Sequence, residues 1–256
     1  MLAFSRADWL FPPFLWGNIG AVLGVFAFSW LVTCGLLALF FRGAKTRWRE
    51  KARYFDQILR AKAHRLRFGS HEHEDVALRR ERVWLTWFFR FWTNFASAPV
   101  LCIGSLLVPF MAFRHSMSGG VFERDYAASW LLPGLCYAGA MLLSFVLKRV
   151  FRRRRPPLQK GDFGYKLTKD PSFPSGHSLT SFCFWAMVPV AAHLTASPPN
   201  TVLKLALMGA AIVLLTGLSR IYLRVHFPSD VAGGFLIGAL WAGVCLCLLP
   251  AALHIG

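Results

Sequence analysis

The sequence predicts an all-α membrane protein, a polytopic bundle of about six transmembrane helices with a basic interfacial segment. Hydrophobic residues make up 55% of the 256-residue chain and aromatic residues 15%, more than an ordinary soluble domain carries. The apolar residues fall in charge-free runs of roughly twenty residues, the length that a helix needs to cross the hydrocarbon core. These runs do not alternate as barrel strands would, so helices are the consistent fold.

Six charge-free runs are the candidate transmembrane helices, and we expect them to form one membrane-embedded domain spanning 1–256. They are residues 14–41, 91–113, 126–147, 178–203, 205–219 and 231–253. The fifth run is short, so we extend its start back through Lys204, whose long stem can reach the membrane interface. The first run is too long for a cleavable signal peptide and is expected to remain as a span.

Prolines, tryptophans and cysteines within or near these runs have expected structural roles. Four prolines are expected to kink the helices rather than end them, namely Pro99, Pro109, Pro133 and Pro189. Tryptophans near the predicted ends, Trp241 among them, are expected to lie at the membrane interface. The six cysteines show no Cys-x2-Cys spacing, so we interpret them as apolar core thiols rather than metal ligands or disulfides.

Most Lys and Arg residues, which give a formal net charge of +17, lie in residues 42–82 and 148–169. This charge favours anionic surfaces or substrates. We interpret 42–82 as a basic interfacial helix on lipid headgroups, with Tyr54, Ile58 and Leu59 as a weak apolar stripe. A solvated charged loop is the alternative. Nucleic acid is not an expected partner, because no recognised motif accompanies the charge.

One stretch is rich in acidic residues and histidine, which are residue types that bind metals. His71, Glu72, His73, Glu74 and Asp75 follow one another in a polar turn, without the ligand spacing of a defined centre. The sequence therefore predicts neither a metal nor a cofactor.

Three polar blocks follow one another in the second half of the chain, each at the edge of an apolar run. They are Lys148-x6-Arg155-Pro156, then Pro174-Ser175-Gly176-His177, then Ser219-Arg220-x5-His226-x3-Asp230. An even number of crossings separates the ends of the third and fifth runs, so the first and third blocks must share a face of the membrane. The second block opens the fourth run on that same face. We therefore expect the three blocks to converge.

The residue types in these blocks suit a phosphate group. Lys148 supplies a compact ammonium, while Arg155 and Arg220 supply planar guanidinium groups that match phosphate oxygens. Ser175 can cap the fourth helix, and Gly176 leaves backbone N–H groups there open to an anion. Taken singly, each block has a structural alternative, such as stop-transfer charges or a simple helix cap. Their occurrence together favours a shared site.

The third block also contains a candidate nucleophile. Asp230 follows His226 by four residues and can accept a hydrogen bond from one imidazole nitrogen. The other nitrogen would then carry a lone pair towards a phosphorus atom. A structural His–Asp hydrogen bond is the alternative, although a carboxylate at the membrane edge is costly enough to favour function.

With all three blocks intact from Lys148 to Asp230, the chain resembles the type 2 phosphatidic acid phosphatase superfamily of membrane lipid phosphatases. The resemblance implies that His226 is the nucleophile, that Asp230 orients it, and that His177 is the general acid and then the general base. It further implies which residues hold the phosphate, namely Lys148, Arg155, Ser175, Gly176 and Arg220. The first half of the chain shares only the architecture.

The function that these residues imply is metal-independent hydrolysis of a lipid phosphate or pyrophosphate through a phosphohistidine. Candidate substrates are undecaprenyl pyrophosphate, phosphatidylglycerophosphate, phosphatidic acid and lipid A phosphates. The list is broad because the residues of the blocks recognise a phosphate group and not a particular lipid tail. A lipid phosphotransferase would share the same intermediate. A non-catalytic protein that binds anionic lipid would need only the cations. Vanadium haloperoxidases have a similar site, but six spans argue against a soluble oxidase.

The expected location is the cell (inner) membrane, as a multi-pass protein. The positive-inside tendency would put the basic face in the cytoplasm, whereas members of the resembled family usually carry the site outside it. Arginines that bind phosphate should be discounted from that count, although residues 42–82 should not. We expect the extracytoplasmic face, with a lipid phosphate as substrate and anionic membrane lipids as further partners. The sequence does not indicate an oligomeric state.

Overall fold

The computed structural model describes residues 24, 27–35, 37, 47–68, 83–118, 124–157 and 170–252. All regular secondary structure within this part of the chain is helical, and the predicted all-α class is confirmed. The helices with defined bounds are α2 (Arg47–Phe68), α4 (Val83–Asn94), α5 (Ala98–Ser118), α6 (Arg124–Ser129), α7 (Leu132–Phe151), α8 (Gly176–Leu194), α9 (Pro199–Tyr222) and α10 (Pro228–Ala252).

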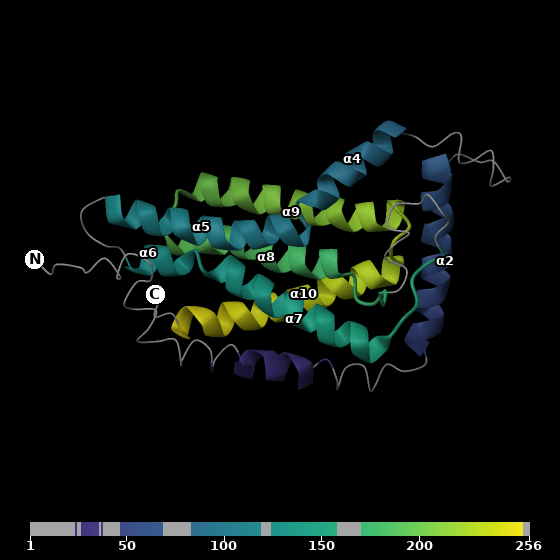
Figure 1. Cartoon of the computed structure of the whole chain (residues 1–256), viewed down its shortest axis with the longest axis horizontal. Coiled ribbons are helices and arrows are strands. Elements are labelled where there is room, and N and C mark those ends of the chain that lie inside the picture. Colours follow the sequence, from purple (N-terminus) through teal and green to yellow (C-terminus); the bar gives the residue numbers. More distant parts are fainter. Residues whose placement is uncertain are drawn as a thin grey trace, which may run out of the picture.

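The long helices form a bundle along the long axis of the molecule (Figure 1). Helix α8 packs against α7, α9 and α10 and so lies at the centre. Helix α4 leaves the bundle obliquely after packing on α9, while α2 lies across one end and packs on α9 and α10 (Figure 1). The crossing α2 therefore covers the end where α7 and α9 finish and α8 and α10 begin.

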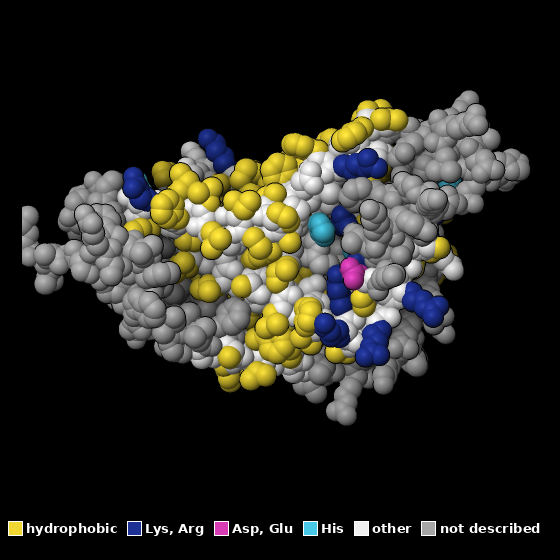
Figure 2. Space-filling view, viewed as in Figure 1, with side chains coloured by type: hydrophobic (Ala, Val, Ile, Leu, Met, Phe, Trp, Pro, Cys, Tyr) yellow, Lys and Arg dark blue, Asp and Glu magenta, His cyan; other side chains and the backbone are white. Residues whose placement is uncertain are grey.

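Four described helices are long and apolar enough to cross a membrane, over residues 98–115, 132–151, 199–222 and 228–248. Their outer faces carry exposed hydrophobic side chains such as Leu106, Leu207 and Leu236, and Figure 2 shows apolar side chains over the middle of one face. A hydrophobic exterior of this kind suits lipid as solvent. The chain is a multi-pass membrane protein, although most of the predicted 14–41 span lies outside the described residues.

Several predicted boundaries are wrong because a charge-free run reports apolarity and not where a helix turns. The 91–113 run is divided between α4 and α5, and the 126–147 run between α6 and α7, which continues to Phe151. The 178–203 run ends with α8 at Leu194. Its last residues belong to α9, which starts at Pro199 and includes Lys204.

Two of the four prolines that we expected to kink helices begin them instead. Pro99 and Pro133 lie in the first turns of α5 and α7, where the missing N–H would have no partner within the helix anyway. Pro109 and Pro189 do lie inside α5 and α8. A proline in an apolar run can therefore begin a helix or lie inside one. Only the position of the preceding turn tells the two cases apart.

The bundle interior centres on Trp241, which is fully buried. Its indole Nε1 donates to the Cys136 carbonyl oxygen at 2.8 Å. A Cβ on Gly139 would lie 2.1 Å from the Trp241 ring, so only glycine leaves room for this contact. The expected interfacial position of Trp241 is wrong, because a glycine on the facing helix provides a place for the ring.

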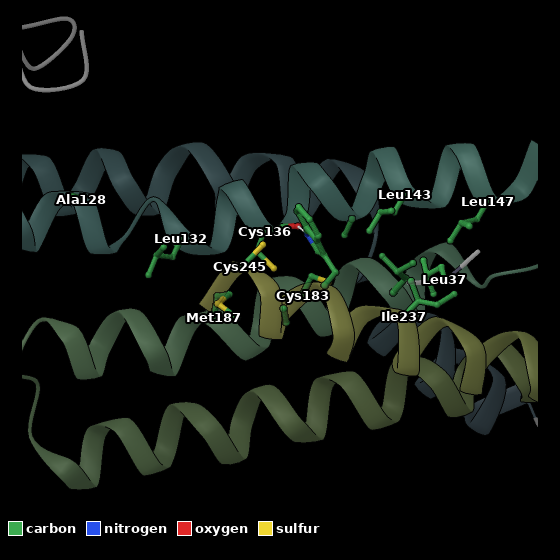
Figure 3. Packing of buried hydrophobic residues seen from close by; sticks show 14 residues of the cluster. Leu37, Ala128, Leu132, Cys136, Leu143, Leu147, Cys183, Met187, Ile237 and Cys245 are labelled. Carbon is green, nitrogen blue, oxygen red and sulfur yellow. Dashed lines mark hydrogen bonds between the residues drawn. The ribbon is translucent and has the colours of Figure 1, made fainter. Parts of the chain in front are cut away.

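The cysteines divide between the interior and the lipid-facing surface. Cys136, Cys183 and Cys245 are buried in the cluster around Trp241, as Figure 3 shows. Cys102 and Cys247 are exposed on the outer surface, so the prediction of core thiols is wrong for these two. In a membrane both surroundings are apolar, and the sequence alone does not separate them.

Helix α2 accounts for the part of the 42–82 segment that the structure describes, so this part is a helix rather than a loop. Tyr54 and Ile58 are exposed on its outer face, and Asp56 is buried on its inner face. Residues 42–46 and 69–82, and with them the stretch from His71 to Asp75, lie outside the described residues.

Helix α10 approaches α8 closely at two glycines. A Cβ on Gly234 would lie 2.8 Å from the Ser175 carbonyl oxygen, and one on Gly238 would lie 3.2 Å from the Leu179 carbonyl oxygen. Small residues four apart let two membrane helices pack with their backbones in contact. The Ser175 N–H also donates to the Asp230 carbonyl oxygen at 3.0 Å. The helix contact thus fixes the second polar block against the third.

Replacing Gly234 tests this close approach. We expect Gly234→Ala to destabilise the protein by about 1–3 kcal/mol, because the added methyl group meets a backbone oxygen that cannot move alone. The measurement is the thermal unfolding midpoint of the purified protein in detergent. Gly243→Ala on the same helix is the matched control, since a Cβ there would meet nothing within 4 Å. Equal midpoints for the two variants would contradict the proposed packing constraint.

Candidate active site

The three polar blocks meet at the end of the bundle that α2 crosses (Figure 1). Lys148 lies in the last turn of α7, His177 in the first turn of α8, Arg220 in the last turn of α9 and Asp230 in the first turn of α10. Figure 2 shows Lys and Arg side chains gathered towards this end. The short turn 223–227 between α9 and α10 carries His226.

Backbone contacts hold the described residues that directly follow α7 and those that precede α8. Helix α7 ends at Phe151. Its C-cap residue, Arg152, has a left-handed φ of 45°, and the Arg152 N–H donates to the Lys148 carbonyl oxygen at 3.0 Å. The carbonyl oxygen of the following residue, Arg153, accepts the Ser172 N–H at 2.7 Å. The segments that precede α8 and follow α7 therefore run together into the site.

The cations predicted to hold phosphate share one electrostatic environment. Lys148, Arg155 and Arg220 act on one another and on His177. A Cβ on Gly176 would lie 3.8 Å from Lys148 Nζ, so the glycine leaves space beside the ammonium. Like charges gathered in a buried site repel one another unless an anion joins them. The arrangement therefore favours binding of an anion.

Arg155 is fixed by main-chain oxygens on both sides of the site. Its Nε donates to the Asp170 carbonyl at 3.0 Å and its Nη1 to the Val225 carbonyl at 3.2 Å. Burial lowers the pKa of Arg155, and the Asp170 and Asp230 carboxylates oppose that change. A guanidinium keeps its charge at neutral pH under such conditions, so Arg155 is a fixed cation.

Arg220 is the most deeply buried of these cations, with only 2% of the residue exposed. Its Nη1 donates to Thr93 Oγ1 of α4 at 3.0 Å. Its Nε has no hydrogen-bond partner among the residues that the structure describes. A buried N–H of a charged group without a partner is costly, so the guanidinium is suited to receive an oxygen of a bound phosphate.

His226 is 2% exposed and is oriented through both ring nitrogens. Its Nε2 lies 3.5 Å from Arg155 Nη1. Its Nδ1 lies 3.5 Å from Ser172 Oγ and 3.7 Å from Asp230 Oδ2. The Ser172 hydroxyl donates to Asp230 Oδ2, so its oxygen can accept from Nδ1–H. This arrangement keeps the lone pair on Nε2, facing Arg155.

The expected direct hydrogen bond between His226 and Asp230 is therefore not formed, since 3.7 Å is beyond hydrogen-bond range. Ser172 contacts both side chains and takes the intermediate place. Ser172 was not predicted from the sequence, where its only signal is its position two residues before Pro174. A serine in a loop that rich in proline does not by itself indicate such a role.

Burial lowers the pKa of His226 to about 4, because the imidazolium loses its solvation. The nearby Asp230 opposes this effect, whereas Arg220 and Arg155 add to it. The imidazole is therefore neutral at physiological pH, as a nucleophile must be.

Asp230 is fully buried and its carboxylate accepts several hydrogen bonds. Besides the Ser172 hydroxyl, Oδ2 accepts the Phe227 N–H at 2.9 Å. The other oxygen, Oδ1, accepts Arg153 Nη1 at 2.6 Å. Arg153 was missed because it lies within a run of four arginines that resembles a headgroup anchor.

Ser175 occupies the N-cap position of α8 as expected, but its side chain makes no capping hydrogen bond. Its hydroxyl oxygen accepts instead from the Ser178 hydroxyl at 2.9 Å. The predicted capping interaction is therefore wrong, and the first N–H groups of α8 are not covered by this side chain. Such N–H groups at a helix start favour an anion.

Comparison with known proteins identifies the family of the chain. Residues 129–253 match the PAP2 superfamily, and this region contains all three polar blocks. Phosphatidylglycerophosphatase B of Bacillus subtilis is 33% identical over 156 residues, which cover 58% of this chain and 71% of that protein. The chain belongs to the PAP2 superfamily. The family predicted from the polar blocks is thereby confirmed, and with it a phosphatase.

Two further relatives extend the comparison of this PAP2 chain. A Mycobacterium tuberculosis decaprenylphosphoryl-5-phosphoribose phosphatase is 30% identical over 138 residues, covering 54% of this chain and 67% of that protein. The crystal structure of a transmembrane PAP2 type phosphatidylglycerolphosphate phosphatase from Bacillus subtilis has a TM-score of 0.57 at 24% identity. It covers 88% of this chain and 94% of the other, so the two share a fold.

The lowered pKa of His226 predicts how stability depends on pH. The unfolded chain binds a proton at this residue near pH 6.5, whereas the folded chain does so only near pH 4. The stability that neutral His226 contributes is therefore complete above about pH 6.5 and declines as the pH falls towards 4. At pH 5 we expect wild type to have lost about 2 kcal/mol more than His226→Asn.

The measurement is the unfolding midpoint in detergent between pH 7.5 and 4.5 for both proteins. Carboxylates titrate in both, so their contribution cancels in the difference. Parallel midpoints over the whole range would contradict a neutral, buried imidazole.

Proposed function

We propose that this PAP2 chain is a metal-independent lipid phosphatase that removes a phosphate monoester or pyrophosphate from a membrane lipid through a phosphohistidine at His226. The observation that supports it most is the orientation of neutral His226, with Nε2 3.5 Å from Arg155 Nη1 and Nδ1 towards Ser172 and Asp230. A protein that only binds anionic lipid would need the cations but no oriented nucleophile. A phosphate held by Arg155 would lie beside Nε2.

In this mechanism the cations first bind the substrate. Lys148, Arg155 and Arg220 take the phosphate oxygens, with the α8 N-terminus at Ser175 and Gly176 beside them. These charges also stabilise the transition state, because phosphoryl transfer spreads negative charge over the equatorial oxygens. No metal ligand is required for either task.

The lone pair of His226 Nε2 then attacks phosphorus, and a nitrogen–phosphorus bond forms as the bond to the leaving oxygen breaks. His177, in its imidazolium form, donates a proton to that oxygen and becomes neutral. Water next gives a proton to His177 and attacks phosphorus, which breaks the nitrogen–phosphorus bond. Inorganic phosphate leaves, and both histidines return to their starting state. The Ser172 oxygen, fixed by Asp230, accepts from Nδ1–H throughout, and the Asp230 carboxylate stabilises the positive ring.

The relatives support a lipid phosphate as the substrate, since one is named for phosphatidylglycerophosphate and another for a decaprenylphosphoryl sugar phosphate. The apolar outer surface of the bundle supports access from the bilayer. Phosphatidylglycerophosphate, phosphatidic acid, undecaprenyl pyrophosphate and lipid A phosphates are the lipids to compare. The basic helix α2 would lie among anionic headgroups at the interface.

The first experiment measures phosphate release from these lipids by the protein purified in detergent. We expect release from at least one lipid, a loss of about a thousandfold or more in His226→Ala, and no effect of EDTA. His193→Ala is the matched control, an exposed histidine at the other end of α8. Full activity in His226→Ala would exclude the nucleophile, and dependence on added metal would exclude the mechanism. Phosphate passed to an added acceptor lipid would instead indicate a phosphotransferase.

We further propose that the active-site end lies on the extracytoplasmic side of the cell membrane, where the substrate headgroups would meet it. An impermeant maleimide should then label Arg154→Cys in intact cells, because Arg154 is exposed at that end. Asn200→Cys is the matched control at the opposite end of the bundle, in the exposed first turn of α9. It should react only after the membrane is opened. The reverse pattern would place the site in the cytoplasm.

A further inference from the structure

A buried network joins the crossing helix α2 to the catalytic carboxylate. Asp56 of α2 is 3% exposed, although it lies in a strongly basic segment. Its Oδ2 accepts Arg153 Nη2 at 2.7 Å, while Arg153 Nη1 donates to Asp230 Oδ1 at 2.6 Å. One guanidinium therefore bridges two carboxylates that are 174 residues apart in the chain, counting from 56 to 230.

The bridge fixes how the Asp230 carboxylate is turned. Arg153 takes Oδ1, which leaves Oδ2 for the Ser172 hydroxyl and the side of His226 Nδ1. A carboxylate can rotate about its terminal bond, so a partner on each oxygen is what defines its plane. The orientation of Asp230 thus depends on where the Arg153 guanidinium is held.

Asp56 is what holds that guanidinium. Arg153 is partly exposed, with 30% of its side chain accessible, and a long arginine side chain loses much rotamer freedom when fixed. Asp56 supplies the second charged partner and also accepts the Ser229 N–H and hydroxyl, at 2.8 and 2.7 Å. The Phe227 ring lies 4.3 Å from the Arg153 Cζ and completes the enclosure.

Charge balance gives Asp56 a second effect. The guanidinium alone would cancel the charge of Asp230, which is the charge that favours an imidazolium at His226. With Asp56 included, the three groups carry −1 + 1 − 1 = −1. The negative charge behind the histidine is thereby kept while the carboxylate stays fixed.

We propose that Asp56 and Arg153 are positioning residues for the nucleophile: Asp56 holds Arg153, and Arg153 turns Asp230 towards Ser172 and His226. This inference rests on the proposed function, since it concerns the histidine that would be phosphorylated. It assigns to α2 a part in the chemistry and not only in membrane contact. Neither residue is a specified position of the three polar blocks, since Asp56 lies outside them and Arg153 lies in the x6 stretch of the first.

The predicted effect falls on turnover and not on phosphate binding, because Lys148, Arg155 and Arg220 keep their contacts. In Asp56→Asn and in Arg153→Gln we expect kcat to fall about ten- to a hundredfold with KM nearly unchanged. The double variant should lose no more than the worse single variant, because the two residues act in series.

Matched controls separate this effect from a general loss of positive charge or of helix stability. Arg154→Gln removes an exposed cation from the same arginine run, and Lys62→Gln removes one from the exposed face of α2. Both should keep wild-type kcat. Additive losses in the double variant, or equal losses in the controls, would overturn the positioning role.

Two inorganic probes test the role without turnover. Orthovanadate mimics the five-coordinate transition state by bonding to the nucleophile, whereas inorganic phosphate requires only the cations. Measured by the rise in unfolding midpoint, vanadate affinity should fall in Asp56→Asn by a factor similar to kcat, and phosphate affinity should stay constant. Equal weakening of both probes would indicate a merely structural role and overturn the proposal.

The outcomes also separate this inference from the proposed function. Wild type that releases no phosphate from any lipid, but whose vanadate affinity depends on Asp56, would overturn the function and keep the positioning role. Normal phosphate release by wild type, together with unchanged kcat and vanadate affinity in Asp56→Asn, would keep the proposed function and overturn the positioning role. If Asp56→Asn shows no unfolding transition, Arg153→Lys carries the same expectation, because one ammonium cannot bridge both carboxylates as a guanidinium does.

Discussion

The burial of the Asp230 carboxylate is the constraint on which the rest of the site depends. A charged group with no exposure is tolerated only when it is fully paired. Its two oxygens therefore collect an arginine, a hydroxyl and a backbone N–H from the chain after α7, the loop before α8 and the turn before α10. The hydrogen bonds that satisfy this one carboxylate bring together segments that carry the candidate nucleophile and cations proposed to bind phosphate.

The bundle supports that arrangement through backbone contact rather than through side chains alone. Gly234 lets α10 approach the start of α8, and the Ser175 N–H donates to the Asp230 carbonyl oxygen. Arg220 is held from a different direction, by Thr93 of α4. The second block is thus tied to α10 and the third to α4, so helix packing sets the spacing between these blocks.

Much of this fold could be predicted from local features of the sequence, because apolar runs define helices and crossing parity defines which ends meet. The bounds were wrong where turns such as the one between α4 and α5 carry no charge to mark them. Trp241 was misplaced because its pocket depends on Gly139 of another helix. Asp56 and Arg153 could not be predicted either, because nothing local distinguishes one arginine of four or one acid of a basic helix from its neighbours.

The pairing of Asp230 also bears on how the site can hold several cations beside a neutral candidate nucleophile. Arg155 and Arg220 both lower the pKa of His226, so they disfavour a positive charge on the free ring. In the proposed mechanism the ring becomes positive when it attacks phosphorus, while the phosphoryl group brings negative charge between the ring and the cations. The Asp56, Arg153 and Asp230 group, with its charge of −1, lies on the opposite side at Nδ1. The proposed mechanism needs a neutral ring before attack and a stabilised positive ring after it, and one arrangement of charges would supply both.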